Sequence, residues 1–408
     1  MKQCFILHTG KEIMKVNFNK LHKEFLEAGM KEVRARELVK QIKQDMRDWP
    51  QAYTDDRNRN EMLQAGFLPG RKYLFGESFN EATRNNYYAD FDYFMAHPLN
   101  NHFAIWINDK LTLKYMLNVD GLKNYIPEYY LYVENDGHYS YLMDSPAEVD
   151  KDADYLLNLL KAKKHLALKP NNGAGGKGFF GLEYSNDTIL KNGTPISIEE
   201  FNELKSELNG YIVTEFIEQI AELDDVLSGT DCALRIILYK TVSGFAEQQP
   251  DYKCLIAYGR FGSSRSDSAS NLCHGGLAVR INWDTGEFEG GFRGNTEFWG
   301  SEGAAGFDKH PDTKIAVDGM PIPNWDIVRN GLLSICNYLS SLDFFGMDVI
   351  ITQDGFKLCE INSAPSTGLG QFHQGKCCLD DEDARSFVES KKRAPRKSFI
   401  DCFNASLE

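Results

Sequence analysis

The sequence lacks the features that mark several large classes of protein. Its 408 residues contain no apolar run long enough to span a membrane. The short apolar patch at residues 4–7 is soon broken by His8 and Lys11, so we expect neither a signal peptide nor a membrane anchor. Basic residues are not in excess, because the net charge is −14, and this argues against nucleic acid as the main partner.

Cysteine pairs with metal-binding spacing are also missing. The nine cysteines are scattered and odd in number, which predicts free thiols and a reducing, cytoplasmic setting. The adjacent pair Cys377-Cys378 is interpreted as incidental rather than redox-active. The chain likewise has no Ser-His-Asp pattern, so a covalent protein nucleophile is not expected.

A predicted β-hairpin carries the most informative pattern that is present. Two short runs rich in β-forming residues flank an Asp-Gly pair at 354–355, which is the strongest local hairpin signal. The hairpin places Asp348 on its first strand and Glu360 and Asn362 on one face of its second. Three converging oxygen ligands suit a hard cation such as Mg²⁺, held against nucleotide phosphates.

A glycine-rich segment at residues 171–178 lies between two predicted strands, 167–170 and 179–184. It cannot be a Walker A loop, which needs a Lys-Ser/Thr pair, or a dinucleotide fingerprint, which must open a helix. A glycine-rich hairpin can instead fold over phosphates and offer them backbone N–H groups, although a flexible hairpin tip explains the composition equally well. The loop residues expected near phosphates are Gly173, Gly175, Gly176 and Lys177.

Two charged residues in apolar strands favour a nucleotide site over a flexible hairpin tip. Lys169 stands in an apolar strand, where burial of its charge is costly unless a ligand such as phosphate compensates. Glu215 lies in the predicted strand 211–217, whose end and short following linker can present backbone groups to an adenine ring. One of three acidic residues nearby is expected to accept from the ribose: Glu218, Glu222 or Asp225.

The remaining patterns place these motifs on a mixed α and β framework. A long helix is predicted from Leu21 to Trp49, ended by Pro50, and a basic run at 391–397 predicts a solvated or loosely docked tail. Further helices are predicted at 111–117, 196–208 and 324–342, and further strands at 232–239, 253–258 and 277–283.

The order of these residues resembles an ATP-grasp enzyme over roughly residues 106–375. The order is Lys110, Lys169, Glu215, Asp348, and then Glu360-Ile361-Asn362. Segments at 310–313, 319–326 and 271–276 resemble a narrower branch, the sugar-transfer-associated ATP-grasp family. The resemblance implies an α+β fold in which two α+β subdomains clamp ATP between antiparallel sheets, with an N-terminal helical or mixed extension. The implied boundaries are 1–105 (extension), 106–210 and 211–378 (subdomains), and 379–408 (tail).

The resemblance also implies a role for each matching residue. Lys110, or Lys114 one turn later, and Lys169 would bind ATP phosphates, and Asp348, Glu360 and Asn362 would hold two Mg²⁺ ions, with Mn²⁺ as an alternative. Adenine would lie against Glu215, Phe216 and Ile217, and the ribose against Glu222. The residues expected to act on the reacting groups are Arg235, Arg260, Arg265 and Asn271.

The implied reaction joins a carboxylate to an amine through an acyl phosphate. The first hypothesis is a ligase acting on a sugar acid or a glycan-linked carboxylate, with an amine, for example an amino acid, as the second substrate. The alternatives are a ligase that adds amino acids to a peptide or protein tail, and a non-catalytic nucleotide-binding module. Two departures from the branch pattern, Ala233-Leu234 before Arg235 and Ser270 before Asn271, fall on the acceptor side. His274 and His373 are interpreted as loop histidines, and three tryptophans as core: Trp283, Trp299 and Trp325.

Overall fold

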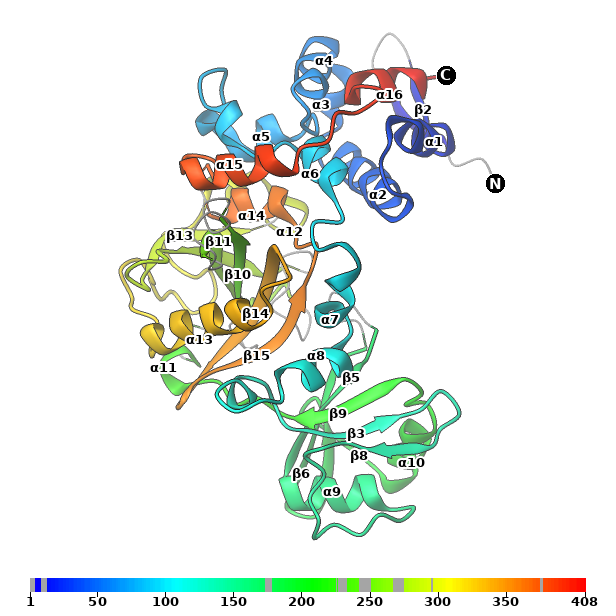
Figure 1. Ribbon diagram of the computed structural model, residues 1–408, viewed down its shortest axis with the longest axis vertical. Coiled ribbons are helices and arrows are strands. Elements are labelled where there is room, and N and C mark those ends of the chain that lie inside the picture. Colours follow the sequence, from blue (N-terminus) through cyan, green and yellow to red (C-terminus); the bar gives the residue numbers. More distant parts are fainter. Residues whose placement is uncertain are drawn as a thin grey trace.

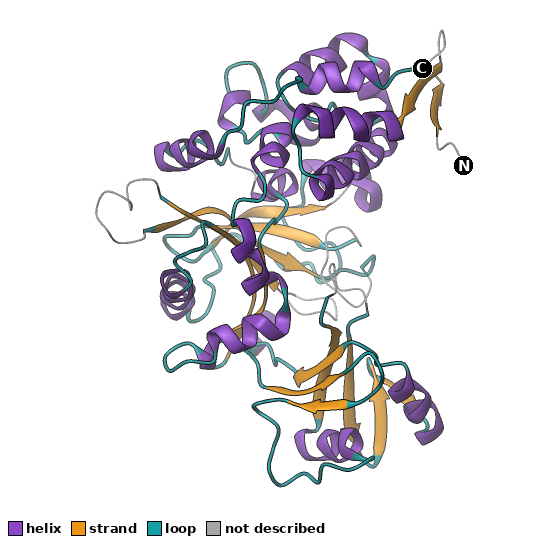
Figure 2. Cartoon of the chain, turned by 45° about the vertical axis from the view of Figure 1, so that its right-hand side comes forward, coloured by secondary structure: helices purple, strands orange, loops and turns teal. Residues whose placement is uncertain are grey.

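The computed structural model describes residues 4–8, 13–172, 178–224, 226, 233–241, 251–266, 275–294, 296–374 and 377–408. The described chain forms three parts along its long axis: a group of helices at one end, a six-stranded sheet, and a seven-stranded sheet (Figures 1 and 2). Both sheets pair all their strands antiparallel, so the predicted α+β class is confirmed. Among the described helices, none has the length and hydropathy of a membrane-spanning segment.

The helical part combines elements from both ends of the chain (Figure 1). Its core contains Phe25, Phe91, Phe387 and Phe403. A strand bridge joins Val16 to Leu407. Its elements are β1 (Cys4–His8), β2 (Ile13–Asn17), α1 (Phe18–Ala28), α2 (Glu32–Asp48), α3 (Pro50–Thr54), α4 (Asp56–Gln64), α5 (Arg71–Phe75), η1 (Gly76–Ser78), η2 (Arg84–Asn86), α6 (Asp90–Ala96), α15 (Glu382–Lys391) and α16 (Phe399–Ala405).

Two predictions about this part are wrong. The single helix from Leu21 to Trp49 is divided into α1 and α2, because Gly29 adopts a left-handed φ of 104° and its N–H bonds back to Leu26 O at 3.0 Å. The tail is not loosely docked, since its basic residues find acidic partners far away in the sequence. Lys391 lies 2.6 Å from Asp343, and Lys397 pairs with two glutamates of α1.

The six-stranded sheet has the order β13-β12-β11-β10-β14-β15. One face packs on the helical part and α14, while the other packs on α13. The elements are α11 (Ala221–Asp224), β10 (Ala233–Lys240), β11 (Tyr252–Phe261), β12 (Leu277–Ile281), β13 (Phe288–Gly294), α12 (Thr296–Ala305), α13 (Trp325–Tyr338), β14 (Phe344–Thr352), β15 (Gly355–Asn362) and α14 (Thr367–Gln374). The predicted strands and the helix before the hairpin are therefore confirmed within a few residues.

The seven-stranded sheet has the order β4-β3-β9-β5-β6-β7-β8. Leu166, Leu168 and Phe180 face the helices α9 and α10, so the alternate residues Ala167 and Lys169 face the other way. The elements are β3 (Tyr129–Val133), β4 (Tyr139–Tyr141), α9 (Tyr155–Lys163), β5 (His165–Pro170), β6 (Phe180–Ser185), β7 (Thr188–Lys191), β8 (Thr194–Ile196), α10 (Ile198–Ser206) and β9 (Tyr211–Glu215). The short helices that precede this sheet in the chain pack instead on the core of the six-stranded sheet: η3 (Asn101–Ala104), α7 (Ile105–Asn108), α8 (Lys110–Leu117) and η4 (Lys123–Tyr125). Ser197 and Glu200 form a capping box at the start of α10.

Candidate active site

The predicted hairpin is β14 and β15, and a bulge sets which of its side chains meet. From Val349 to Thr352 the strands pair in one register, with Val349 opposite Leu358. The register then shifts by one residue, so Asp348 pairs with Glu360 and Cys359 is the extra residue. Without this shift Asp348 would lie opposite Cys359, and Glu360 would lie on the other face of the sheet. The bulge therefore brings the two carboxylates onto one face.

Asp348 is buried and held by two arginines from neighbouring strands. Arg235 lies directly opposite it on β10; its Nη2 donates to Asp348 Oδ2 at 2.9 Å and its Nε donates to Oδ1. Arg260 Nη2 of β11 lies 3.0 Å from the same Oδ2. Burial raises the pKa of Asp348, but the two guanidinium groups outweigh it and lower that pKa to about 2. Asp348 is therefore a carboxylate throughout the physiological pH range.

Glu360, Asn362 and Lys110 complete this side of the site. Asn362 Nδ2 donates to Glu360 Oε1 at 3.0 Å, and Lys110 Nζ lies 3.9 Å from Glu360 Oε2. Asp109 caps α8 by accepting from Thr112 N at 2.8 Å, which fixes the start of the helix that carries Lys110.

Lys110 and Lys114, the two alternatives for one phosphate-binding position, differ in their surroundings. Lys110 Nζ donates to Asn171 O at 3.3 Å, beside the glycine-rich segment. Lys114 Nζ instead lies 2.6 Å from Asp144 and donates to Pro127 O at 2.9 Å. The structure therefore brings Lys110 to Glu360 and holds Lys114 at a different buried ion pair.

Lys169 lies on the face of the seven-stranded sheet that is turned toward this cluster. Its Nζ lies 5.5 Å from the centroid of the Tyr129 ring, and within the described chain no hydrogen bond or ion pair reaches it. Burial lowers the pKa of Lys169, and the charge of Lys110 lowers it further against the opposing effects of Cys359 and Glu360. A phosphate at this point would supply the charged partner that Lys169 lacks among the described residues.

The described cluster has more positive than negative charge. Its cations are Arg235, Arg260, Lys110 and Lys169, and its carboxylates are Asp348 and Glu360. The side chain of Arg260 is only 10% exposed, and its buried Nε has no hydrogen-bond partner in the described part of the chain. An excess of buried positive charge and an unsatisfied donor favour an anionic ligand.

A divalent cation fits the donor set of the hairpin. Asp348, Glu360 and Asn362 offer carboxylate and amide oxygens, which are the ligands that Mg²⁺ prefers. Each carboxylate oxygen has two lone pairs, so the arginine contacts of Asp348 do not exclude a metal bond. The described residues hold no group of three His, Cys, Asp or Glu that could bind a metal, so the third member of the hairpin's donor set is the amide of Asn362.

The segment predicted to hold adenine lies where β9 ends. Glu215 Oε2 accepts from Glu128 N at 3.0 Å and lies 3.3 Å from Lys357 Nζ of β15, so it links the two sheets. Phe216 stacks on His165, with ring centroids 3.5 Å apart. Ile217 follows as a half-buried residue, and Glu222 is exposed on α11.

The remaining predicted residues lie elsewhere or outside the described chain. The guanidinium of Arg265 lies 4.1 Å from the centroid of the Trp299 ring, and its Nη1 donates to Phe298 O. Asp348 is not among the described contacts of Arg265. The three tryptophans belong to or pack against the core, as predicted. Outside the described residues lie Gly173, Gly175, Gly176, Lys177, Asp225, Asn271 and His274, together with the side chain of His373.

The sequence reasoning missed the residues that fasten the loop after Asn362. Asn108 Nδ2 of α7 donates to Ser363 Oγ at 2.9 Å, and Ser363 N donates to Asn108 Oδ1 at 3.0 Å. The Tyr93 hydroxyl of α6 donates to Pro365 O. These contacts hold the segment after β15 against α7 and, through Tyr93, against the helical part. A long sequence separation left no local signal for them.

Comparison with known proteins gives a family and a weak likeness to solved structures. N5-carboxyaminoimidazole ribonucleotide synthetase from Thermotoga maritima is 14% identical, with a TM-score of 0.32, over 67% of this chain and 49% of that protein, about half of its length. D-alanine–D-alanine ligase from Bacillus anthracis is 12% identical, with a TM-score of 0.34, over 72% of this chain and 71% of that one. The search of curated proteins gave no match.

The family match carries the assignment, because the structural scores are too low to do so. The model of the sugar-transfer associated ATP-grasp family matches residues 94–382, which include both sheets and the whole cluster described above. The enzyme class predicted from the sequence, an ATP-grasp ligase, agrees with this match. The chain belongs to the sugar-transfer associated ATP-grasp family.

Proposed function

We propose that the protein is an ATP-dependent carboxylate–amine ligase acting on a sugar acid or a polysaccharide-linked carboxylate. The observation that carries this proposal is the buried cluster in which four cations face the paired carboxylates of Asp348 and Glu360. Such a cluster matches the charge of a nucleotide triphosphate with its metal, and the family match supports ATP as the nucleotide. The cleft would lie between subdomains 106–210 and 211–378.

The residues of the candidate active site have separate roles in this proposal. Lys110 and Lys169 bind the phosphates, and Glu215, Phe216 and Ile217 line the adenine site. Asp348, Glu360 and Asn362 would hold Mg²⁺, which when bound neutralises phosphate charge. Arg235 positions Asp348, because it makes two hydrogen bonds to that carboxylate.

The chemistry requires two displacements. A substrate carboxylate oxygen attacks the γ-phosphorus of ATP, the bond to the bridging oxygen breaks, and ADP leaves. The amine then attacks the acyl carbon, loses a proton, and the C–O bond to phosphate breaks to leave an amide. Lys110 and Lys169 stabilise charge in the first step, and the unsatisfied Nε–H of Arg260 is available to the acyl phosphate or its tetrahedral intermediate.

The test is a coupled assay with Mg²⁺-ATP, a panel of uronic acids and a panel of amino acids, in which ADP and phosphate are followed. We expect ADP formation to depend on a uronic acid, and hydroxylamine to trap the acyl phosphate as a hydroxamate when no amine is added. Glu360→Ala is expected to abolish turnover, while the control Glu389→Gln on the exposed face of α15 leaves it unchanged. ADP formation with peptides but not with uronic acids would refute the sugar-acid assignment.

A further inference from the structure

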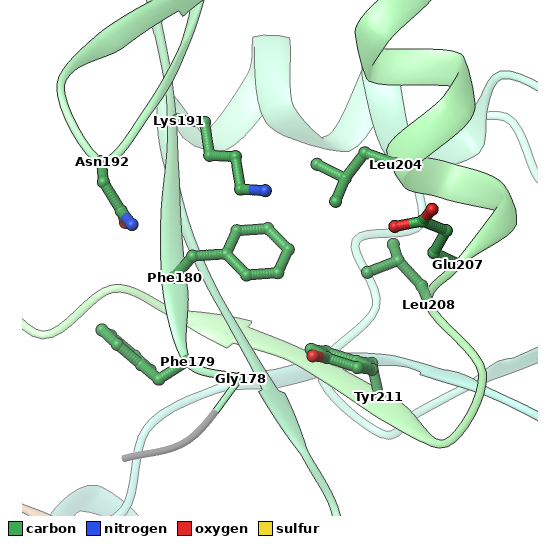
Figure 3. A pocket seen from close by; sticks show the side chains of 9 residues that line it. All are labelled: Gly178, Phe179, Phe180, Lys191, Asn192, Leu204, Glu207, Leu208 and Tyr211. Atoms are coloured by element: carbon green, nitrogen blue, oxygen red, sulfur yellow. The ribbon is translucent and has the colours of Figure 1, made fainter.

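A pocket of about 320 Å³ opens on the side of the seven-stranded sheet that faces away from the candidate active site. Phe180 and Tyr211 line it from β6 and β9, and Leu204 and Leu208 line it from α10 and the turn that follows (Figure 3). Phe180 belongs to the core on the α9 and α10 side, whereas Lys169 belongs to the opposite face of the same sheet. The pocket is therefore separate from the site proposed for ATP.

Two side chains of opposite charge face this pocket without pairing. Lys191 extends from the end of β7 toward α10, and the carboxylate of Glu207 turns back toward the same space (Figure 3). Among the described residues neither forms an ion pair, and Lys191 Nζ lies 4.8 Å from the centroid of the Phe180 ring. An ammonium and a carboxylate on the walls of one pocket, beside apolar side chains, complement a ligand that carries both charges.

We propose that this pocket binds a free α-amino acid with an apolar side chain. Lys191 pairs with the ligand carboxylate, Glu207 pairs with its ammonium, and the side chain lies on Leu204, Leu208 and Phe180. The volume is at the small end of the range for ligand pockets, which suits a molecule of this size. Binding of the amino acid does not depend on the substrates proposed above, whereas its coupling to ATP rests on the proposed ATP site.

The pocket also contacts the end of the glycine-rich segment. Gly178 lines it and has a φ of 80°, and a Cβ placed there would lie 2.7 Å from the hydroxyl oxygen of Tyr211 and 2.9 Å from Pro170. There is thus no room for a side chain between Gly178 and the Tyr211 hydroxyl, which lies at one wall of the pocket. A ligand that fixes Tyr211 would preorganise this backbone, so amino acid and ATP should bind with positive coupling.

Calorimetric titration of the full chain with three related compounds tests the charge requirement. L-Phenylalanine is expected to bind, whereas 3-phenylpropanoate and 2-phenylethylamine, which each lack one charge, are expected to bind at least tenfold more weakly. L-Leucine and L-methionine are the aliphatic probes. Equal binding of phenylalanine and either single-charge analogue would overturn the proposal. Failure of phenylalanine, leucine and methionine all to bind would also overturn it.

Variants locate the binding to this pocket. Lys191→Gln and Glu207→Gln should each weaken phenylalanine binding at least tenfold, because each removes one charged hydrogen-bond partner. Two variants are matched controls. Lys161→Gln removes a lysine that lies over the Tyr184 ring of the same sheet, and Glu203→Gln removes a glutamate of α10 one turn before Glu207. Loss of binding in a control as large as in its partner would refute this location. Saturating phenylalanine should tighten ATP binding about fivefold or more, and an unchanged or weaker affinity would refute the coupling.

Discussion

Replacing Arg235 with methionine tests the central ion pair of the candidate site. Arg235 makes two hydrogen bonds to Asp348, whose side chain is 6% exposed, and Arg260 makes one further contact. The pKa of Asp348 is about 2 against an ordinary 3.8, and each pKa unit corresponds to about 1.4 kcal/mol. The surroundings thus favour the carboxylate by about 2 kcal/mol even though burial opposes it. Removing the nearer arginine should destabilise the sheet by about 2–3 kcal/mol, somewhat less than full loss of a buried pair.

A double-mutant cycle separates the charge interaction from lost packing. The pair Arg235→Met/Asp348→Asn should be closer in stability to the wild type than Arg235→Met alone, because no unpaired carboxylate remains. The half-exposed pair of Lys253 on β11 and Asp383 on α15 supplies the control: Lys253→Met should cost less than about 1 kcal/mol. Urea unfolding without nucleotide or metal, with hydrogen exchange of the β10 and β14 amides, measures each effect. Strict additivity of the two single variants would refute the reasoning.

Three further predictions concern the bulge, a buried acid and the two lysines. Deleting Cys359 removes the extra residue of the bulge and should leave Glu360 opposite Asp348, so Mg²⁺-dependent ATP binding should be retained in a calorimetric titration, and its loss would contradict the register argument. Burial raises the pKa of Asp45 to about 6, so the folded state binds this proton more tightly than the unfolded state and stability falls as pH rises toward 6. Urea unfolding should lose about 2 kcal/mol between pH 4.5 and 7.5, and Asp45→Asn should remove that slope; an unchanged slope would exclude Asp45 as its source. Lys110→Gln should raise the KM for ATP at least tenfold with little loss of stability, whereas Lys114→Gln should lower the Tm, and the reverse pattern would exchange their roles.

The hairpin shows how far local sequence signals reach. The Asp-Gly pair at 354–355 and the β-forming runs beside it predicted β14 and β15 correctly, because a two-residue turn sets strand pairing near itself. The bulge at Cys359 carries no comparable signal. Its consequence is large, since it decides whether Glu360 faces Asp348, yet it depends on packing on both faces of a sheet whose other strands come from distant segments.

The helical part shows where charge patterns mislead. The run at 391–397 reads as solvated because like charges repel, but Lys397 lies 2.6 Å from both Glu24 and Glu27 of α1. Phe399 and Phe403 of α16 are buried beside it. Partners more than 300 residues apart cannot be paired from one sequence. Burial of the tail therefore became evident only in three dimensions.

The two lysines of α8 define the limit for the site itself. Lys110 and Lys114 are four residues apart, so helical periodicity places them on one face and cannot rank them. Asp144 favours Lys110 as the phosphate-binding residue, because Asp144 pairs with Lys114 whereas Lys110 lies beside Glu360. The need of Lys169 for a partner was predictable, because an unpaired charge in an apolar strand is costly to bury. In the structure, burial lowers the pKa of Lys169. Sequence thus indicates which charges need a partner, whereas the fold decides which of them receive one from the protein and which remain for a ligand.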